Sequence, residues 1–149
     1  MKLAIKVLSP LLGKEIPLPS YATVGSAAMD LRACVEEAVV IAPGARVVVP
    51  SGIAIALPSS EYVALLFARS GLAAKGGVSL ANGVGVIDSD YRGEIGVALL
   101  NTSDAPYTIL PGDRIAQLMI TPVVQPTLEV VEELPETDRG AGGFGSTGR

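Results

Sequence analysis

An apolar run ends in a cluster of polar side chains within residues 83–94, whose sequence is GVGVIDSDYRGE. Val84, Val86 and Ile87 favour a partly buried β-strand, and turn-forming residues begin at Asp88. Catalytic side chains are commonly held where a rigid strand meets a loop, which makes Asp88 the leading candidate catalytic residue. A plain β-hairpin with solvated charges in its turn accounts for the same residues, and this segment alone favours that simpler explanation.

The absence of histidine narrows the chemistry that the chain can perform. It excludes Ser-His-Asp and Cys-His nucleophiles, HExxH zinc sites and histidine-based proton transfer. A general base that works near neutral pH is therefore a carboxylate, or a strongly perturbed Lys, Tyr or Cys. The formal net charge of −4 argues against a broad basic surface, so we expect no direct nucleic-acid binding. An anionic ligand then requires arginines gathered at one site.

Polar side chains also interrupt two apolar runs that are predicted to be strands. Asp30 lies in the run 29–34, where an exposed face or an ion pair with Arg32 or another arginine is the simpler explanation. Arg114 and Gln117 lie three positions apart in the run 114–121, so a regular strand would direct them to opposite faces. We expect these two side chains to have different roles.

Arg69 and Ser70 stand at the start of a short predicted helix, residues 70–75. Free N–H groups and the positive end of the helix dipole make such a position suitable for phosphate. The alternative is simple N-capping by Ser70, which is the commoner use of a serine there.

The C-terminal residues differ in character from the rest of the chain. Residues 128–138 are acidic with some apolar residues between, and they are compatible with one more strand before a linker. Residues 139–149 follow with five glycines in the sequence RGAGGFGSTGR, which cannot build a core. A flexible tail is the simpler explanation, but accessible N–H groups, two hydroxyls and two arginines also suit a phosphate clamp. We therefore expect one β domain over residues 1–138 and a glycine-rich arm over 139–149.

Composition indicates a single folded domain. The chain has 149 residues, of which 49% are hydrophobic and 17% are charged, and this balance is typical of globular proteins. No apolar run approaches the ~20 residues that a membrane-spanning helix needs, and residues 1–10 do not resemble a secretory signal. We expect the one cysteine, Cys34, to be a buried thiol and the protein to be cytoplasmic.

Eleven prolines and 17 glycines divide the chain into short apolar runs. The clearest runs are residues 3–8, 29–34, 38–41, 46–49, 53–57, 62–68, 93–101, 107–110 and 114–121. Short strands at this spacing, bounded by turn signals, predict an all-β fold of the sandwich, jelly-roll or barrel-like kind with one short helix.

Five segments together resemble the ordered motifs of the trimeric dUTPases, and most closely those of bacterial members. They are AAMDLRA, ARSGLAAKGG, NGVGVIDSDYRGE, PGDRIAQLMI and RGAGGFGSTG, and the resemblance extends from about residue 20 to residue 148. It implies a distorted jelly-roll domain, hydrolysis of dUTP to dUMP and pyrophosphate, and a homotrimer whose three active sites are shared between subunits. Such an enzyme limits uracil in DNA and supplies dUMP for dTTP synthesis.

The resemblance also implies a role for each residue of the third motif. Asp88 would activate the water that attacks the α-phosphorus, which agrees with a histidine-free chain. Tyr91 would pack against the deoxyribose and exclude a 2′-hydroxyl. Asn82 and the backbone of a hairpin over residues 82–87, including Gly85, Val86 and Ile87, would bind the polar edge of uracil.

The other motifs would bind the triphosphate and the metal. Arg69, Ser70, Gly71 and Gln117 match the phosphate-binding positions of the family. In the arm, Arg139, Ser146 and Thr147 would close on the β- and γ-phosphates, beside Gly145, while Phe144 stacks over uracil. Mg²⁺ is expected on phosphate oxygens and waters, with no direct side-chain ligand and with Asp30 contacting it through water. Arg114 is expected to be structural.

The departures from the family pattern are small, and three rival interpretations remain. Ala28-Met29 stands where Gly-Tyr or Gly-Leu is common, and Gly76-Gly77 replaces a frequent His-Gly pair. The rivals are a dCTP deaminase or a bifunctional deaminase–hydrolase, a non-catalytic nucleotide-sensing β trimer, and a purely structural jelly roll. An intact Asp88, the Phe144-bearing arm and Asn82 favour the simple hydrolase.

Overall fold

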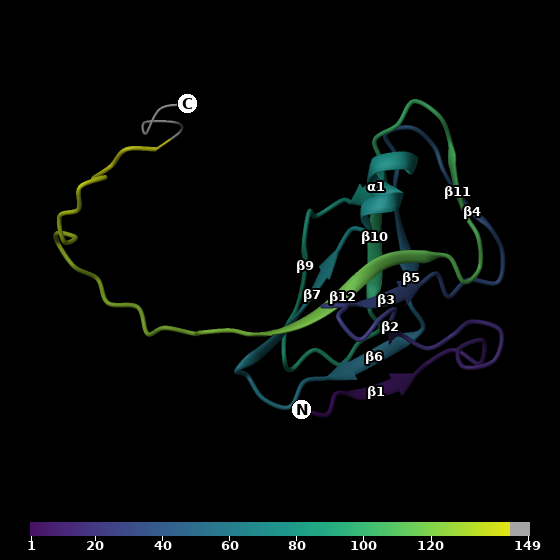
Figure 1. Cartoon of the computed structure of the whole chain (residues 1–149), viewed down its shortest axis with the longest axis horizontal. Helices are drawn as coiled ribbons and strands as arrows, with labels where there is room; N and C mark the ends of the chain where they lie inside the picture. Colours follow the sequence, from purple (N-terminus) through teal and green to yellow (C-terminus); the bar gives the residue numbers. More distant parts are fainter. Residues whose placement is uncertain (144–149) are drawn as a thin grey trace.

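The computed structural model describes residues 1–143, which form twelve β-strands and one α-helix (Figure 1). The elements in chain order are β1 (Ala4–Val7), β2 (Ser20–Tyr21), β3 (Met29–Arg32), β4 (Val39–Ile41), β5 (Arg46–Pro50), β6 (Ile53–Ala56), β7 (Tyr62–Phe67), α1 (Ser70–Gly76), β8 (Val78–Leu80), β9 (Gly85–Ile87), β10 (Gly96–Asn101), β11 (Tyr107–Ile109) and β12 (Arg114–Pro122). Each apolar run that was predicted to be a strand overlaps one of these strands. The all-β prediction is confirmed.

The strands pair into four antiparallel sheets. The largest has the order β2-β3-β12-β7-β9, and a second has the order β5-β10-β8. Two further pairs, β1-β6 and β11-β4, complete the arrangement. No sheet closes on itself within residues 1–143, so the described part of the chain is not a closed barrel. The jelly-roll arrangement stays a prediction.

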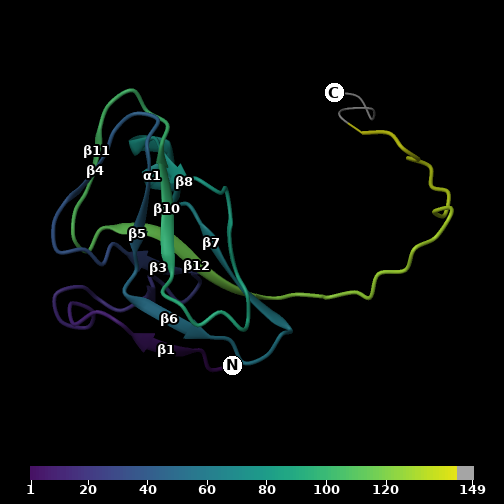
Figure 2. The same ribbon diagram turned by 180° about the vertical axis from the view of Figure 1, so that it is seen from behind.

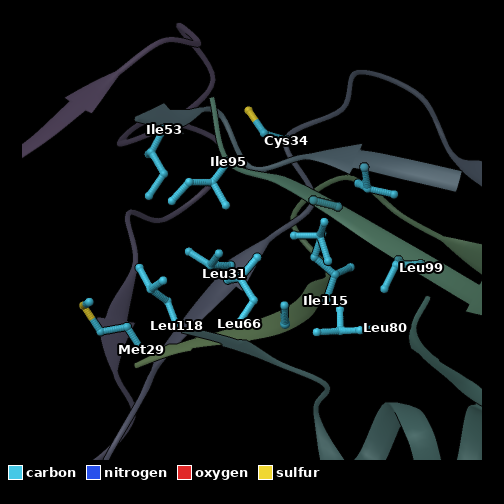
Figure 3. Close-up of a cluster of buried hydrophobic side chains, with 14 of the residues drawn as sticks. Met29, Leu31, Cys34, Ile53, Leu66, Leu80, Ile95, Leu99, Ile115 and Leu118 are labelled. Atoms are coloured by element: carbon cyan, nitrogen blue, oxygen red, sulfur yellow. The ribbon is translucent and has the colours of Figure 1, made fainter. Parts of the chain in front are cut away.

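One buried cluster joins the two larger sheets (Figure 3). Leu31, Leu66 and Leu118 come from the five-stranded sheet, and Leu80 and Leu99 come from the three-stranded sheet. Burial of one such leucine contributes about 1.5–3 kcal/mol relative to exposure. This shared core fixes β7 and β12 against the rest of the domain, and these two strands pair with β9 and β3, which carry candidate site residues.

The cysteine prediction is confirmed, because Cys34 is a free thiol that belongs to the same buried cluster. Its sulfur packs against Gly52, whose positive φ of 72° a glycine adopts readily. A Cβ at Gly52 would lie only 2.5 Å from that sulfur. Backbone conformation and space both require glycine at this turn.

Helix α1 begins as predicted at Ser70, but Ser70 is not its N-cap. The N-cap is Arg69, which has extended backbone angles, and no side-chain hydrogen bond caps the helix. The helix ends at Gly76, and its C-cap is Gly77, a left-handed residue with φ of 64° whose N–H donates to the Ala73 carbonyl. The capping explanation for Ser70 is therefore wrong.

The chain leaves the β domain after β12. The Val123 N–H donates to the Glu61 carbonyl at 2.8 Å, and from there residues 123–143 extend away from the strands in both views (Figures 1 and 2). Apolar side chains in this segment are strongly exposed, such as Leu128 at 89% and Val130 at 99%. The predicted strand within residues 128–138 is not formed, since a strand needs a neighbouring strand and no described segment of this chain lies beside it.

The described residues contain no helix long and apolar enough to cross a membrane. The domain boundary at residue 138 stays a prediction, although the last strand already ends at Pro122.

Candidate active site

Six of the predicted site residues surround one pocket of about 230 Å³. The pocket lies where β9 ends and is lined by Leu66, Asn82, Gly85, Val86, Ile87, Asp88, Tyr91, Glu94, Ile95 and Gly96. Its size suits part of a small molecule, and its lining joins apolar side chains to a few polar groups, as ligand pockets usually do.

Strand β9 lies at the edge of the five-stranded sheet. It pairs with β7 on one side, Ile87 opposite Ala64 and Gly85 opposite Leu66, and no described strand pairs with its other side. The free side of an edge strand presents unpaired N–H and C=O groups. Gly85 also brings the backbone close to the core, because a Cβ there would lie 3.0 Å from the Leu66 side chain. The pocket therefore has backbone donors and acceptors along one wall.

The segment around β9 is not a hairpin, which corrects two expectations. β8 pairs with β10, whereas β9 pairs with β7, so residues 82–87 connect two different sheets. β10 likewise belongs to the other sheet, so the plain-hairpin interpretation of residues 83–94 is also wrong. A turn at Gly83, with φ of 72° and an N–H bonded to the Leu80 carbonyl, carries Asn82 to the mouth of the pocket.

Asp88 is the free carboxylate of this pocket. It follows the last residue of β9, is exposed, and no described residue donates a hydrogen bond to its carboxylate. The turn after it is closed by the Tyr91 N–H, which donates to the Asp88 carbonyl at 3.2 Å. The other carboxylate of the pocket, Glu94, accepts a hydrogen bond from the Gly52 N–H at 2.8 Å. Asp88 is thus the carboxylate available for proton transfer.

Hydrogen bonds to the backbone hold the loop that follows Asp88. The Arg92 Nη1 atom donates to the carbonyls of Ser89 at 2.8 Å and Tyr91 at 2.9 Å. The Tyr91 hydroxyl donates to the Glu94 carbonyl at 3.0 Å, which turns its ring along the wall of the pocket. Arg92 and Glu94 therefore fix this loop.

A second group of predicted residues gathers around Asp30, which is only 9% exposed. Its Oδ1 accepts a hydrogen bond from Arg69 Nε at 3.0 Å, and its Oδ2 accepts one from Arg114 Nη1 at 3.2 Å. The ion-pair explanation for Asp30 is confirmed. Its partners are Arg69 and Arg114, because Arg32 instead donates to the Gly112 carbonyl at 2.8 Å.

A β-bulge places Arg114 and Gln117 on the same face of the sheet. In the β12–β3 register Arg114 lies opposite Arg32 and Gln117 lies opposite Asp30, with a shift between Arg114 and Ala116. Opposed residues point to one face, and Asp30 and Arg32 share a face of β3. The expectation of opposite faces is wrong, because the extra residue of a bulge inverts the alternation. Gln117 therefore stands beside the Asp30 ion pairs.

The arginines of this group border a basic pocket of about 360 Å³. It is lined by Arg69, Gly71, Leu72, Lys75, Tyr107, Ile109, Asp113 and Arg114. Arg69, Lys75 and Arg114 outnumber the two nearby carboxylates, Asp113 in the lining and Asp30 behind the two arginines, and this excess of positive charge favours an anionic ligand. Lys75 and Arg114 were not predicted here, and only the bulge and the helix geometry bring them to the site.

The two groups lie at opposite ends of β7. Ile87 is opposite Ala64, so Asp88 lies beside the Tyr62 end, whereas Arg69 follows the Phe67 end. Five residue steps separate these ends, or about 17 Å at the usual strand rise. No residue lines both pockets. One copy of the chain thus assembles its candidate residues in two separate sets.

The described residues of the arm, 139–143, make no contact with either set of candidate residues. Arg139 is exposed, and its Nε donates to the Gly142 carbonyl at 2.9 Å within the arm itself. Phe144, Gly145, Ser146 and Thr147 lie outside the described residues. Within residues 1–143, no three His, Cys, Asp or Glu side chains gather as a ligand set for a metal ion.

Comparison with known proteins indicates the same family as the five sequence motifs. The family model described as dUTPase matches residues 14–148. The deoxyuridine 5′-triphosphate nucleotidohydrolase of Acinetobacter baumannii is 52% identical over 149 residues, which cover 100% of this chain and 99% of that protein. The protein of the same name from Citrobacter koseri is 50% identical over 148 residues, which cover 99% of this chain and 97% of that one.

Solved structures share the fold. A mutant dUTPase of Staphylococcus bacteriophage 80alpha with dUpNHpp superposes with a TM-score of 0.87 at 30% identity, covering 99% of both chains. A mutant dUTPase of phage phi11 of S. aureus, described with a structural Mg(II) ion, superposes with a TM-score of 0.78 at 26% identity, covering 91% of this chain and 100% of that one. On its motifs, its fold and these matches, the chain belongs to the dUTPase family.

Proposed function

We propose that this chain hydrolyses dUTP to dUMP and pyrophosphate. One observation carries the proposal: a free carboxylate, Asp88, stands in a pocket whose other wall is the unpaired edge of β9. The relatives that are 50–52% identical to the chain are named for this reaction, which supports the same substrate here.

The nucleoside end of dUTP fits the Asp88 pocket. Uracil carries donors and acceptors along one edge, which the backbone of β9 and the Asn82 side chain can satisfy. An analogue with a different edge leaves buried polar groups unpaired, and such sites reject it strongly. The Tyr91 ring stands beside the sugar and leaves no room for a 2′-hydroxyl.

Asp88 supplies the base for the chemical step. It accepts a proton from a water molecule while the water oxygen forms a bond to the α-phosphorus. The bond between that phosphorus and the bridging oxygen breaks, and pyrophosphate leaves. General-base catalysis by a positioned carboxylate contributes about 10²–10⁴-fold to such a rate. The remainder comes from fixed in-line geometry and stabilised phosphate charge.

The phosphates belong to the second set of residues. Arg69 and Gly71 line the basic pocket, Ser70 opens α1, and Gln117 shares a sheet face with Asp30. Guanidinium groups and backbone N–H groups are suitable donors to phosphate oxygens. We therefore assign Arg69, Ser70, Gly71 and Gln117 to the triphosphate.

The separation of the two sets supports a shared site in a homotrimer. A nucleotide bound beside Asp88 would meet the Arg69 set of a neighbouring copy rather than that of its own chain, because β7 separates the two sets. Residues 123–143 extend away from their own β domain (Figure 2), which suits a role of the arm residues Arg139, Phe144, Gly145, Ser146 and Thr147 at the site of another copy. Each active site would then draw on several subunits.

The residues present fit Mg²⁺ held by phosphate oxygens and water. Each Asp30 oxygen accepts one arginine donor, and a carboxylate has about four acceptor sites, so acceptor capacity remains for a metal-bound water. Mg²⁺ retains several waters and binds few carboxylates, so it needs no cage of acidic side chains. When bound, the ion would neutralise phosphate charge and help to orient the triphosphate.

Pyrophosphate release from dUTP, UTP, dTTP and dCTP, measured side by side, tests the function. We expect release from dUTP at a rate far above that from the other three. Deamination of dCTP would instead support the deaminase interpretation, and binding of dUTP without release would support a nucleotide sensor. If the chain hydrolyses dUTP as proposed, it limits uracil in DNA and supplies dUMP. A cytoplasmic location stays a prediction.

A further inference from the structure

Gly93 lies directly against the ring of Tyr91. A Cβ built at Gly93 would lie 2.6 Å from the Tyr91 Cζ and 3.0 Å from its Cε2, and it would collide with the hydroxyl oxygen. Ordinary carbon–carbon contacts are about 3.5–4.0 Å, so even one methyl group would displace the ring by about 1 Å. The absent side chain creates the space that the ring occupies.

Backbone conformation does not explain this glycine. Gly93 is absent from the glycines with positive φ, which include Gly77, Gly83 and Gly112. Alanine can therefore adopt the Gly93 backbone angles without the strain of a left-handed residue. Space for the Tyr91 ring is what the position requires.

The remaining contacts of the loop hold the ring against Gly93. The Tyr91 hydroxyl donates to the Glu94 carbonyl at 3.0 Å, and the Glu94 carboxylate is bound by the Gly52 N–H at 2.8 Å. Arg92 Nη1 fixes the Tyr91 carbonyl at 2.9 Å. These hydrogen bonds hold the ring on the pocket wall that it shares with Asp88.

We propose that Gly93 is a specificity-determining position, which sets the depth of the Tyr91 ring and thereby the selection of deoxyribose over ribose. The inference rests on the proposed function, since it assumes that Tyr91 packs against the sugar of dUTP. Gly93 acts through Tyr91 and touches no substrate, so it is a positioning residue. Its replacement should change sugar selection more than the chemical step, because Asp88 precedes the loop and keeps its own strand.

The test compares kcat and KM for dUTP and UTP in Gly93→Ala and in a matched control, Gly25→Ala. Gly25 is exposed, lacks a positive φ, and a Cβ there meets nothing within 4 Å. We expect Gly93→Ala to lower the dUTP-to-UTP ratio of kcat/KM at least about tenfold, the scale of a one-methyl misfit. kcat for dUTP should stay within about threefold, and Gly25→Ala should match the wild type.

A double-mutant cycle with Tyr91→Ala shows whether the effect passes through the ring. In the Tyr91→Ala background, Gly93→Ala should leave the selectivity ratio unchanged. If Gly93→Ala alone does not fold but the double variant does, that result would also support the contact between Gly93 and the Tyr91 ring. The inference is overturned if neither Gly93→Ala nor the double variant folds. It is also overturned if Gly93→Ala lowers the selectivity ratio equally in the wild-type and Tyr91→Ala backgrounds.

The outcomes separate this inference from the proposed function. A wild-type chain that releases no pyrophosphate from dUTP contradicts the proposed function, and the inference falls with it. A wild-type chain that selects dUTP, with a folded Gly93→Ala variant that selects it equally well, contradicts the inference alone.

Discussion

Arg69 donates its Nε hydrogen to Asp30 Oδ1 at 3.0 Å, which ties the start of α1 to the middle of β3. The second oxygen of Asp30 is bound by Arg114 of β12. One nearly buried carboxylate therefore orients two guanidinium groups toward the same pocket. The proposed phosphate-binding set therefore depends on a β-strand carboxylate that need not touch phosphate itself.

Replacing Asp30 by asparagine should weaken both stability and phosphate binding. The amide keeps one acceptor but turns an N–H₂ group toward an arginine. The side chains of Arg69 and Arg114 are 24% and 44% exposed, so water screens part of the lost interaction. We expect a loss of about 1–2 kcal/mol in unfolding free energy and a higher KM for dUTP.

Urea unfolding and steady-state kinetics measure the two effects of Asp30→Asn. The control is Asp104→Asn, an exposed aspartate outside both pockets, which should leave both quantities unchanged. Wild-type KM and stability in Asp30→Asn would show that the ion pairs do not organise the site.

Two variants that are inactive alone should regain activity when mixed, if active sites are shared between copies. Asp88→Asn removes the base and Arg69→Gln removes a phosphate donor, and these residues lie at opposite ends of β7. In randomly mixed trimers, about one quarter of the sites would combine an intact Asp88 with an intact Arg69. Pyrophosphate release from co-refolded mixtures should therefore approach a quarter of the wild-type rate.

A mixture that stays as inactive as its components would mean that each chain builds its own site. Separately refolded variants, mixed without exchange of subunits, supply the control for simple addition of residual rates.

Deletion of residues 139–149 should leave the β domain folded but reduce hydrolysis strongly. The described part of this segment makes its hydrogen bonds within the arm or to Thr137, so the core loses no contact with it. We expect an unchanged thermal midpoint and a fall in kcat/KM of about 10²-fold or more, since closure excludes water and fixes the phosphates. Full activity of the shortened chain would remove the arm from the mechanism.

Local signals predicted the strands well, because the strands are short and several of them are bounded by turns with proline or glycine. The run 46–49 became β5 (Arg46–Pro50), and 107–110 became β11 (Tyr107–Ile109). Asp88 was also found from a local signal, since it follows its strand directly, whereas the other candidate pocket residues came from the resemblance to the dUTPase motifs. What local signals could not supply is which strand pairs with which.

Three errors share that origin. The hairpin at residues 82–87 failed because β8 and β9 pair with distant strands instead of each other. The bulge before Ala116 moved Arg114 onto the Gln117 face and into the Asp30 ion pairs. The strand predicted within residues 128–138 did not form, because this segment has an apolar pattern but no neighbouring strand among the described residues of its own chain. Each depends on long-range pairing, which residue propensities do not encode.

The most direct test of the account is the turnover of Asp88→Asn with dUTP, measured beside its affinity for the analogue dUpNHpp. Asparagine keeps the shape of the side chain but cannot accept the proton of water. We predict a fall in kcat of about 10²–10⁴-fold with affinity within about threefold, while the neighbouring control Asp90→Asn stays near wild type. An Asp88→Asn variant that turned over dUTP at close to the wild-type rate would contradict the central claim that Asp88 is the base.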